Sequence, residues 1–377
     1  MNPPNQLKPQ RKLYLDVARV VAIISISLNH AVNRSYENYT DQMAEFFSIP
    51  LASTVFKTVI SIFSRIGVPL FLMITGVLIL NKRMETKDDI KKFYKHNLLS
   101  LFITTEIWYV LMYWFIVLFK SADSVLETRG ILGAILGMFE TMLFQNQVTF
   151  GSMWYMPMIL CLYTTLPFVI VVKDKLSGSR LSPVLFLPAA ILFLFAMVLP
   201  ALNSLLAVLG LPTYTSAIGE IYLFSYYYSY IIIGYLVGKG TLAKIKTWLI
   251  GLIAGLSFLL CCGYQFYVYS QPLDYLVAYS FPLIPVCAGA LFELIRRCGE
   301  HFRRLERPIT YLSRISFGIY FVHIVIMTCL VSLTNNFSIP RPLLLIILEV
   351  GSFVGSILVI MPLSKIKVLK KYLFLIK

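Results

Sequence analysis

Long apolar runs, separated by short polar segments, dominate this chain. No Asp, Glu, Lys or Arg occurs in three of these runs, Thr141 to Val172, Leu181 to Gly219 and Thr247 to Leu273. Each run exceeds the roughly 20 helical residues that cross a hydrocarbon core. The apolar periodicity and its polar breaks predict ten helices, at 13–33, 52–80, 96–119, 151–172, 183–201, 219–238, 247–268, 274–295, 314–334 and 343–364. The pattern predicts an all-α polytopic membrane protein with about ten transmembrane helices.

The composition excludes a set of soluble domains. Of the 377 residues, 58% are hydrophobic and 14% are charged, whereas about a quarter of the residues in a soluble domain are charged. So few charges cannot cover so much apolar surface in water. A lipid bilayer is therefore an expected partner, and we expect a multi-pass protein of the inner (plasma) membrane.

The basic residues that give the net charge of +15 are distributed so that they predict the orientation of the chain in the membrane, and they do not indicate a nucleic-acid partner. If the N-terminus is placed inside, the basic residues cluster in segments on the inner side, at 8–12, 82–95, 173–180, 239–246, 296–314 and 365–377. The opposite side holds only Arg34, Lys120, Arg129 and Arg341. This asymmetry predicts cytoplasmic termini, with a tail at 1–12, one transmembrane domain at 13–364 and a basic tail at 365–377. No nucleic-acid binding is expected.

Cysteine usage gives no sign of a metal site or a disulfide framework. The six cysteines lack ligand-like spacing, and most fall within predicted helices. We interpret them as small buried apolar residues, and we expect no bound metal and no resident cofactor.

The first predicted helix carries ionisable groups on one face. Arg19 and His30 are eleven residues apart, which is about 20° past three full turns, and Asp16 and Asn33 lie near the same stripe. Ionisable residues inside a membrane usually mark a site or a pathway. Alternatively, Arg19 is a structural partner of Asp16, and His30 only bonds to a neighbouring helix.

Four sequence phrases, in order along the chain, resemble those of the membrane acyltransferase-3 family. They are Leu15-Asp16-x-x-Arg19-x(10)-His30, Gly67-Val-Pro-Leu-Phe-Leu-Met-Ile-Thr-Gly76, Met153-Trp154-Tyr155-Met156 and Ser316-Phe-Gly-Ile-Tyr320-Phe-Val-His323. Without an appended hydrolase-like domain, the chain is similar to the stand-alone branch, such as the enterobacterial common antigen O-acetyltransferase. The resemblance implies transfer of an acyl group, usually acetyl from cytoplasmic acetyl-CoA, to a hydroxyl of a lipid-linked or cell-surface glycan.

The residues suit this chemistry. A neutral imidazole is a suitable general base for a hydroxyl that must attack a thioester, and His30 fits that role. Cations near the cytoplasm, at Lys82–Lys95 and Arg19, would bind the phosphates of the acyl-CoA donor. Many family members carry an Arg-x-x-Arg pair where this chain has Lys92-Phe-Tyr-Lys95, so the charge is kept but the bidentate fork of arginine is lost.

Four further candidate residues each have two interpretations. His323 either packs and supports a neighbour or contacts the acceptor. Arg65, just before the Gly67-Val-Pro69 break, either lines a ligand cavity on the donor side or pairs with Glu106 or Glu349. Trp154 and Tyr155 form either an aromatic belt at the outer interface or a platform for a sugar.

Two other classes of function remain open at this stage. A transporter or flippase of a lipid-linked sugar or small solute would use His30 and the acidic residues as a proton relay. Against it, the chain shows no two similar halves with paired broken helices. A non-catalytic membrane scaffold or sensor leaves the stripe of Arg19 and His30 unexplained.

Overall fold

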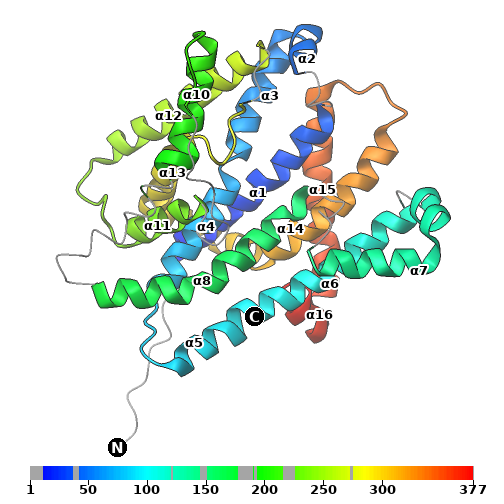
Figure 1. The fold of residues 1–377 in the computed structure, drawn as a ribbon, viewed down its shortest axis with the longest axis horizontal. Coiled ribbons are helices and arrows are strands. Elements are labelled where there is room, and N and C mark those ends of the chain that lie inside the picture. Colours follow the sequence, from blue (N-terminus) through cyan, green and yellow to red (C-terminus); the bar gives the residue numbers. More distant parts are fainter. Residues whose placement is uncertain are drawn as a thin grey trace, which may run out of the picture.

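The computed structural model describes residues 12–36, 42–119, 122–144, 151–176, 190, 193–214, 226–271 and 275–376, which form a bundle of helices (Figure 1). In chain order the helices are α1 (Leu13–Ser35), α2 (Gln42–Ser48), α3 (Leu51–Ser64), α4 (Gly67–Ile79), α5 (Lys87–Phe93), α6 (Leu99–Phe119), α7 (Ala122–Met142), α8 (Tyr155–Leu176), α10 (Leu199–Val208), α11 (Tyr227–Gly238), α12 (Thr247–Tyr269), α13 (Leu283–Cys298), α14 (Glu306–Thr334), α15 (Arg341–Leu363) and α16 (Lys367–Tyr372). A π-helical turn, Tyr94–Leu98, joins α5 to α6, and 3₁₀ turns, Gly151–Trp154 and Gly299–Leu305, precede α8 and α14.

The all-α membrane fold is confirmed. Within the described residues, seven segments are long and apolar enough to cross a membrane: Leu13–Ser35, Leu51–Ile79, Lys87–Phe119, Tyr155–Leu176, Thr247–Tyr269, Leu283–Thr334 and Arg341–Leu363. The apolar helices Gly130–Met142, Leu194–Val208 and Tyr227–Gly238 are shorter. Two of the ten predicted helices, 183–201 and 219–238, lie partly outside the described residues.

Helix α1 lies at the centre of the bundle and contacts α3, α4, α13, α14 and α15 (Figure 1). Its small residues Ala18 and Ala22 are completely buried, as is Ile23. Polar side chains of α1 therefore face other helices or internal cavities, which is where a membrane protein can tolerate them.

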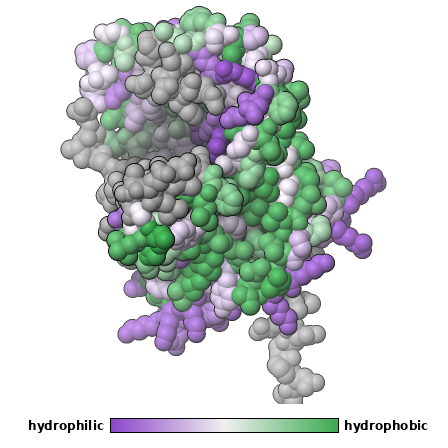
Figure 2. All heavy atoms as spheres, turned by 90° about the vertical axis from the view of Figure 1, so that its right-hand side faces the viewer, coloured by the Kyte–Doolittle hydropathy of each residue, from purple (hydrophilic) through white to green (hydrophobic). Residues whose placement is uncertain are grey.

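The outward faces of the peripheral helices are apolar. On α15 the exposed side chains include Val350, Val354 and Leu358, whereas Ser352 and Ser356 are buried. Figure 2 shows a broad hydrophobic surface, with hydrophilic side chains at its lower and right-hand edges and in a separate group in the upper part of the view. Exposing so large an apolar surface to water would be unfavourable, whereas the hydrocarbon core of a bilayer matches it.

The predicted helix 52–80 is interrupted. The first part, α3, ends at Ser64, and α4 starts at Gly67. Pro69 has no N–H for the carbonyl of Arg65, and its ring would clash with that carbonyl in a continuous helix. At Gly67 the chain passes so close to α1 that an added Cβ would lie 2.7 Å from the Ala22 carbonyl oxygen.

The predicted start of the helix at 274–295 is wrong, because α13 begins only at Leu283. Pro282 disfavours a helical conformation at the residue before it. The non-helical backbone before α13 is held by α12, where the side-chain oxygen of Gln265 accepts a hydrogen bond from Val277 N at 2.8 Å. Two other predicted helices begin earlier than expected, since 96–119 continues back through α5 to Lys87 and 314–334 starts at Glu306.

The predicted basic tail at 365–377 packs against the bundle in its described part, up to residue 376. It forms α16, and Phe374 behind it is completely buried. In addition, the indole Nε1 of Trp108 on α6 donates a 2.8 Å hydrogen bond to the carbonyl of Leu373. This segment therefore belongs to the folded domain.

Helices α4 and α11 touch through their backbones. A Cβ added at Gly76 would overlap the carbonyl of Ile231, and one added at Gly234 would overlap the carbonyl of Met73. Small residues at such crossings let membrane helices approach closely, and van der Waals packing is a main force that holds them together.

We therefore expect Gly234→Ala to lower the free energy of unfolding by about 3 kcal/mol, because backbone atoms cannot yield as side chains do. The matched control is Gly255→Ala on α12, where an added Cβ would meet no heavy atom within 4 Å. Thermal unfolding in detergent measures both variants. Equal melting temperatures would contradict the close packing of α4 and α11.

Candidate functional site

Two imidazoles meet in the middle of the bundle. His30 of α1 and His323 of α14 have ring centroids 5.3 Å apart. Nδ1 of His323 lies 2.7 Å from the carbonyl oxygen of Ile319, which can only accept, so this nitrogen carries a proton and donates it. The Nε2 atom of neutral His323 is then an acceptor, and it is buried with no hydrogen-bond partner among the described residues.

The two rings differ in accessibility. His323 is completely buried, whereas His30 is half-buried. His30 can therefore reach a ligand, and the free acceptor atom of His323 can bond to a hydroxyl or to the neighbouring imidazole. A hydroxyl group between the two rings would have an acceptor for its proton.

Towards the start of α1, a polar network joins this helix to α14. The carboxylate of Asp16, which is 1% exposed, accepts a hydrogen bond from Ser313 Oγ at 2.7 Å and one from Thr310 Oγ1 at 3.4 Å. Nη1 of Arg19 lies 3.2 Å from Oδ1 of Asp16 and 3.4 Å from Ser313 Oγ. The alternative pairing of Arg19 with Asp16 thus exists in the structure, and the carboxylate fixes the direction of the guanidinium.

Arg19 also faces a large cavity, which we call the inner cavity. Its volume is about 890 Å³, and its lining includes residues of α16 and of the turn Tyr94–Leu98, which lie on the side predicted to be cytoplasmic. Five basic residues line it: Arg19, His96, Lys367, Lys370 and Lys371. Most of the remaining lining is apolar or aromatic and includes Ile26, Phe71, Ile74, Tyr155, Tyr163 and Tyr320.

The inner cavity approaches the histidine pair, although neither His30 nor His323 is part of its lining. Tyr320, part of its lining, has its ring centroid 6.4 Å from that of His323 and 5.8 Å from that of Tyr155. Ile26, also in the lining, is one turn before His30 on α1. An elongated ligand with an anionic end and an apolar arm fits a cavity with cations at its mouth and aromatic rings at depth.

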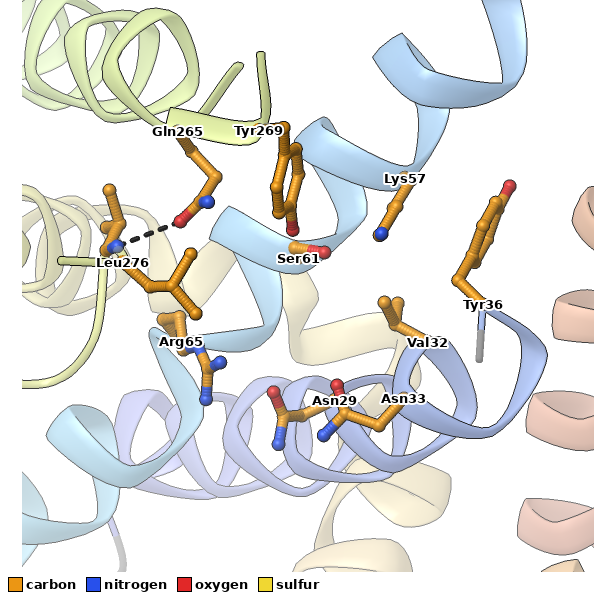
Figure 3. A pocket seen from close by; sticks show the side chains of 11 residues that line it. Asn29, Val32, Asn33, Tyr36, Lys57, Ser61, Arg65, Gln265, Tyr269 and Leu276 are labelled. Atoms are coloured by element: carbon orange, nitrogen blue, oxygen red, sulfur yellow. Dashed lines mark hydrogen bonds between the residues drawn. The ribbon is translucent and has the colours of Figure 1, made fainter. Parts of the chain in front are cut away.

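A second, smaller pocket lies beside α1 at Asn29–Asn33, and we call it the outer pocket (Figure 3). Its lining is mostly polar and comes from α1, α3 and α12 and from the segment before α13: Asn29, Val32, Asn33, Tyr36, Lys57, Ser61, Arg65, Gln265, Tyr269, Leu276 and Val277. The enclosed volume of about 20 Å³ holds a hydroxyl group or a water molecule, not a sugar ring.

Cations and aromatic rings surround the outer pocket. Lys57 Nζ lies 2.7 Å from Glu45 Oε2 and 4.5 Å from the ring centroid of Tyr269. Glu45 of α2 also pairs with Arg341 at the start of α15. Helix α2 is thereby fastened to α3 and α15 beside the outer pocket.

The face of α1 orders these features along one line. Ile26 lines the inner cavity, Asn33 lines the outer pocket, and His30 lies between them on the same face. The axial steps are about 6 Å from Ile26 to His30 and about 4.5 Å from His30 to Asn33. The histidine pair is thus placed where a ligand from one side can meet a ligand from the other.

Lys92 and Lys95 lie outside the lining of the inner cavity. The predicted helix 96–119 begins after both residues, but in the structure Lys87–Leu98 is helical, so both lie within a helix. Both side chains are exposed, and Lys95 borders a separate apolar hollow with Phe102 and Pro157. Their role in donor binding stays a prediction.

Arg65 and Glu106 do not come together. Arg65 lines the outer pocket, away from the donor side on which it was predicted, and its guanidinium lies 5.7 Å from the ring centroid of Tyr279. Both carboxylate oxygens of Glu106 are buried and have no hydrogen-bond partner among the described residues. The predicted alternative of an Arg65–Glu106 pair is therefore wrong.

Trp154 and Tyr155 point to different surroundings. Trp154, 38% exposed, has its ring 5.8 Å from Tyr227 and 5.5 Å from Tyr279. Tyr155 is half-buried and lines the inner cavity beside Tyr320. Through Tyr279 the Trp154 group is continuous with Arg65, so an aromatic surface lies next to the outer pocket.

Several lining residues escaped the sequence interpretation. The inner cavity includes His96 and the lysines of α16, and the outer pocket includes Asn29, Gln265 and Tyr269. The polar residues Asn29 and Gln265 within apolar runs were a usable signal. The lysines of α16 gave none, because the orientation rule already accounts for basic residues in that segment.

Comparison with known families agrees with this arrangement. A family model described as an acyltransferase domain, that of the acyltransferase 3 family, matches residues 12–363. No curated protein and no solved structure matches the chain. The match spans α1 to α15 and includes both histidines of the central pair, so this chain is a membrane acyltransferase that belongs to the acyltransferase 3 family.

Proposed function

We propose that the protein, without a resident cofactor, transfers an acyl group from cytoplasmic acyl-CoA to a hydroxyl group of a lipid-linked or cell-surface glycan. The acyl group proposed is acetyl, and the membrane proposed is the inner (plasma) membrane. The observation that carries this proposal is the position of His30 between the inner cavity and the outer pocket.

The donor fits the inner cavity by its chemistry. Coenzyme A combines a phosphorylated end with a long pantetheine arm, and the cavity combines cations with an apolar, aromatic interior. Arg19 lies roughly 16 Å along α1 from His30, a distance that the pantetheine arm can cover. The thioester would then lie next to the histidine pair.

The acceptor approaches from the outer pocket. Only a small group enters the pocket itself, so the sugar ring would rest against the aromatic surface of Trp154 while one hydroxyl points to His30. Amide groups from Asn29 and Asn33 and the cation of Arg65 line the path. Such groups suit the hydroxyls of a carbohydrate.

The reaction needs one proton acceptor. The imidazole of His30 takes the proton of the acceptor hydroxyl as its oxygen attacks the thioester carbonyl carbon. The carbon–sulfur bond then breaks, and the thiolate of coenzyme A leaves and receives the proton from His30. The products are an O-acyl glycan and free coenzyme A, and the enzyme returns to its starting state.

Glycan analysis tests this function. Cells that make the protein should carry base-labile O-acetyl groups on an envelope glycan, detected by mass spectrometry, and cells that make His30→Asn should not. In parallel, the purified wild-type protein should bind acetyl-CoA in detergent. Identical glycans in both strains, together with no acetyl-CoA binding, would contradict the proposal and favour a transporter.

A further inference from the structure

The α16 segment, which we define as residues 364–376, is held in a slot on the bundle. Phe374 is completely buried, and a Cβ added at Gly318 of α14 would lie 2.8 Å from its Cδ1 atom. The missing side chain at Gly318 therefore makes room for the ring. The hydrogen bond from Trp108 Nε1 to the Leu373 carbonyl fixes the same turn from α6.

This anchoring presents three lysines to the inner cavity. Lys367, Lys370 and Lys371 follow the i, i+3, i+4 spacing of one helix face, and all three line the cavity together with Arg19 and His96. None of the described residues that line the cavity is Asp or Glu. No ion pair joins these lysines to the described residues. Lys371 Nζ lies 4.7 Å from the ring centroid of Tyr372, a contact that leaves its charge available to an anion.

We propose that the α16 segment binds the phosphate groups of the acyl-CoA donor, with Lys367, Lys370 and Lys371 as the cations. The inference rests on the proposed function, because it assigns the donor end of the same site. The nucleotide part of coenzyme A carries several phosphates, and ammonium groups bind phosphate oxygens by charge-assisted hydrogen bonds. Lys92 and Lys95, in contrast, do not line the cavity.

The first experiment measures coenzyme A binding, which does not depend on acyl transfer. The variant replaces Lys367, Lys370 and Lys371 by glutamine, and its matched control replaces Lys239, Lys244 and Lys246, three exposed lysines outside the cavity. Binding is measured by titration calorimetry in nanodiscs of phosphatidylcholine, which contain no anionic lipid. The α16 variant should bind coenzyme A about 10- to 100-fold more weakly than the control, and the difference should shrink at high salt.

The second experiment separates the phosphates from the acyl group. With acetyl-CoA, the α16 variant should show a KM raised by about the same factor, with kcat nearly unchanged. With S-acetylpantetheine, which lacks the nucleotide phosphates, variant and wild type should have equal kcat/KM. An equal loss with both donors would mean general damage to the fold and would overturn the proposal.

The outcomes distinguish this inference from the proposed function. If wild type, control and α16 variant bind coenzyme A equally, the α16 proposal fails and the proposed function stands. If the wild-type protein binds no coenzyme A, both fail. If the lysines only hold anionic lipid, coenzyme A binding in phosphatidylcholine will be unaffected by their loss, and binding to nanodiscs with phosphatidylglycerol will change instead.

The anchor offers an independent check that leaves the charges in place. Phe374→Ala empties the slot at Gly318, so the α16 segment should detach more often. Coenzyme A should protect Lys370 and Lys371 from trypsin in the wild-type protein, and this protection should be lost in Phe374→Ala. Equal cleavage with and without coenzyme A in the wild type would contradict donor contact with α16.

Discussion

Replacement of His30 by alanine should lower acyl transfer by about 10²–10⁴-fold, the usual cost of removing a general base. The imidazole is half-buried between the inner cavity and the outer pocket, next to the ring of His323. No residue that supplies charge to the inner cavity is removed by this change. The His30→Ala protein should therefore insert normally and bind acetyl-CoA with wild-type affinity.

Steady-state transfer of radiolabelled acetyl groups measures this effect, and titration calorimetry measures donor binding. His301→Ala is the matched control, because His301 is exposed on the 3₁₀ turn before α14. It should keep full activity. If His30→Ala retains half of the wild-type turnover, His30 is not the general base.

Replacement of Arg19 by alanine should leave the enzyme nearly inactive at donor concentrations that saturate the wild type, because the donor binds much more weakly. We expect donor affinity to fall by about 1.5–3 kcal/mol, the range for hydrogen bonds to charged groups. Arg19→Lys should also be impaired, since lysine keeps the charge but not the planar fork that Asp16 and Ser313 now orient. Arg19 is roughly 16 Å from His30 along α1, so it cannot act on the imidazole by direct contact.

Binding of acetyl-CoA to Arg19→Ala, Arg19→Lys and His30→Ala separates the roles. Only the two Arg19 variants should lose affinity. Arg303→Ala provides the control, because its ion pair with Glu300 is exposed at the surface. Normal donor binding by Arg19→Ala, combined with a lower melting temperature, would show that Arg19 serves only as a structural partner of Asp16.

The helix pattern was predictable wherever a helix faces lipid along its whole length. The prediction 247–268 matches α12 at Thr247–Tyr269, and 343–364 matches α15 at Arg341–Leu363. Between their ends, α12 carries no charged residue and α15 carries only Glu349, so hydropathy alone marks where both helices begin and end. Hydropathy did not predict the helix ends correctly near two prolines. Pro69 splits the predicted helix 52–80, and Pro282 delays the start of α13.

The sequence by itself also determined the face of α1 that carries the candidate chemistry. Helical spacing alone aligns Arg19 with His30, because the period of an α-helix is fixed by local geometry. The partners of that face were not predictable in the same way. His323, Ser313 and the lysines of α16 lie about 290 to 350 residues further along the chain.

Only the tertiary structure decided which helix packs against α1 and which basic residues face the inner cavity. A rule that places lysine and arginine on the cytoplasmic side accounts for Lys92 as well as for Lys370, so charge alone could not separate a donor site from an orientation signal. The distinction between lysines that line the cavity and lysines that do not depends on Gly318. Because Gly318 has no side chain, Phe374 fits against it, and this contact holds α16 beside the cavity. Such a contact depends on the fit of two distant surfaces, and no local pattern of residues encodes it.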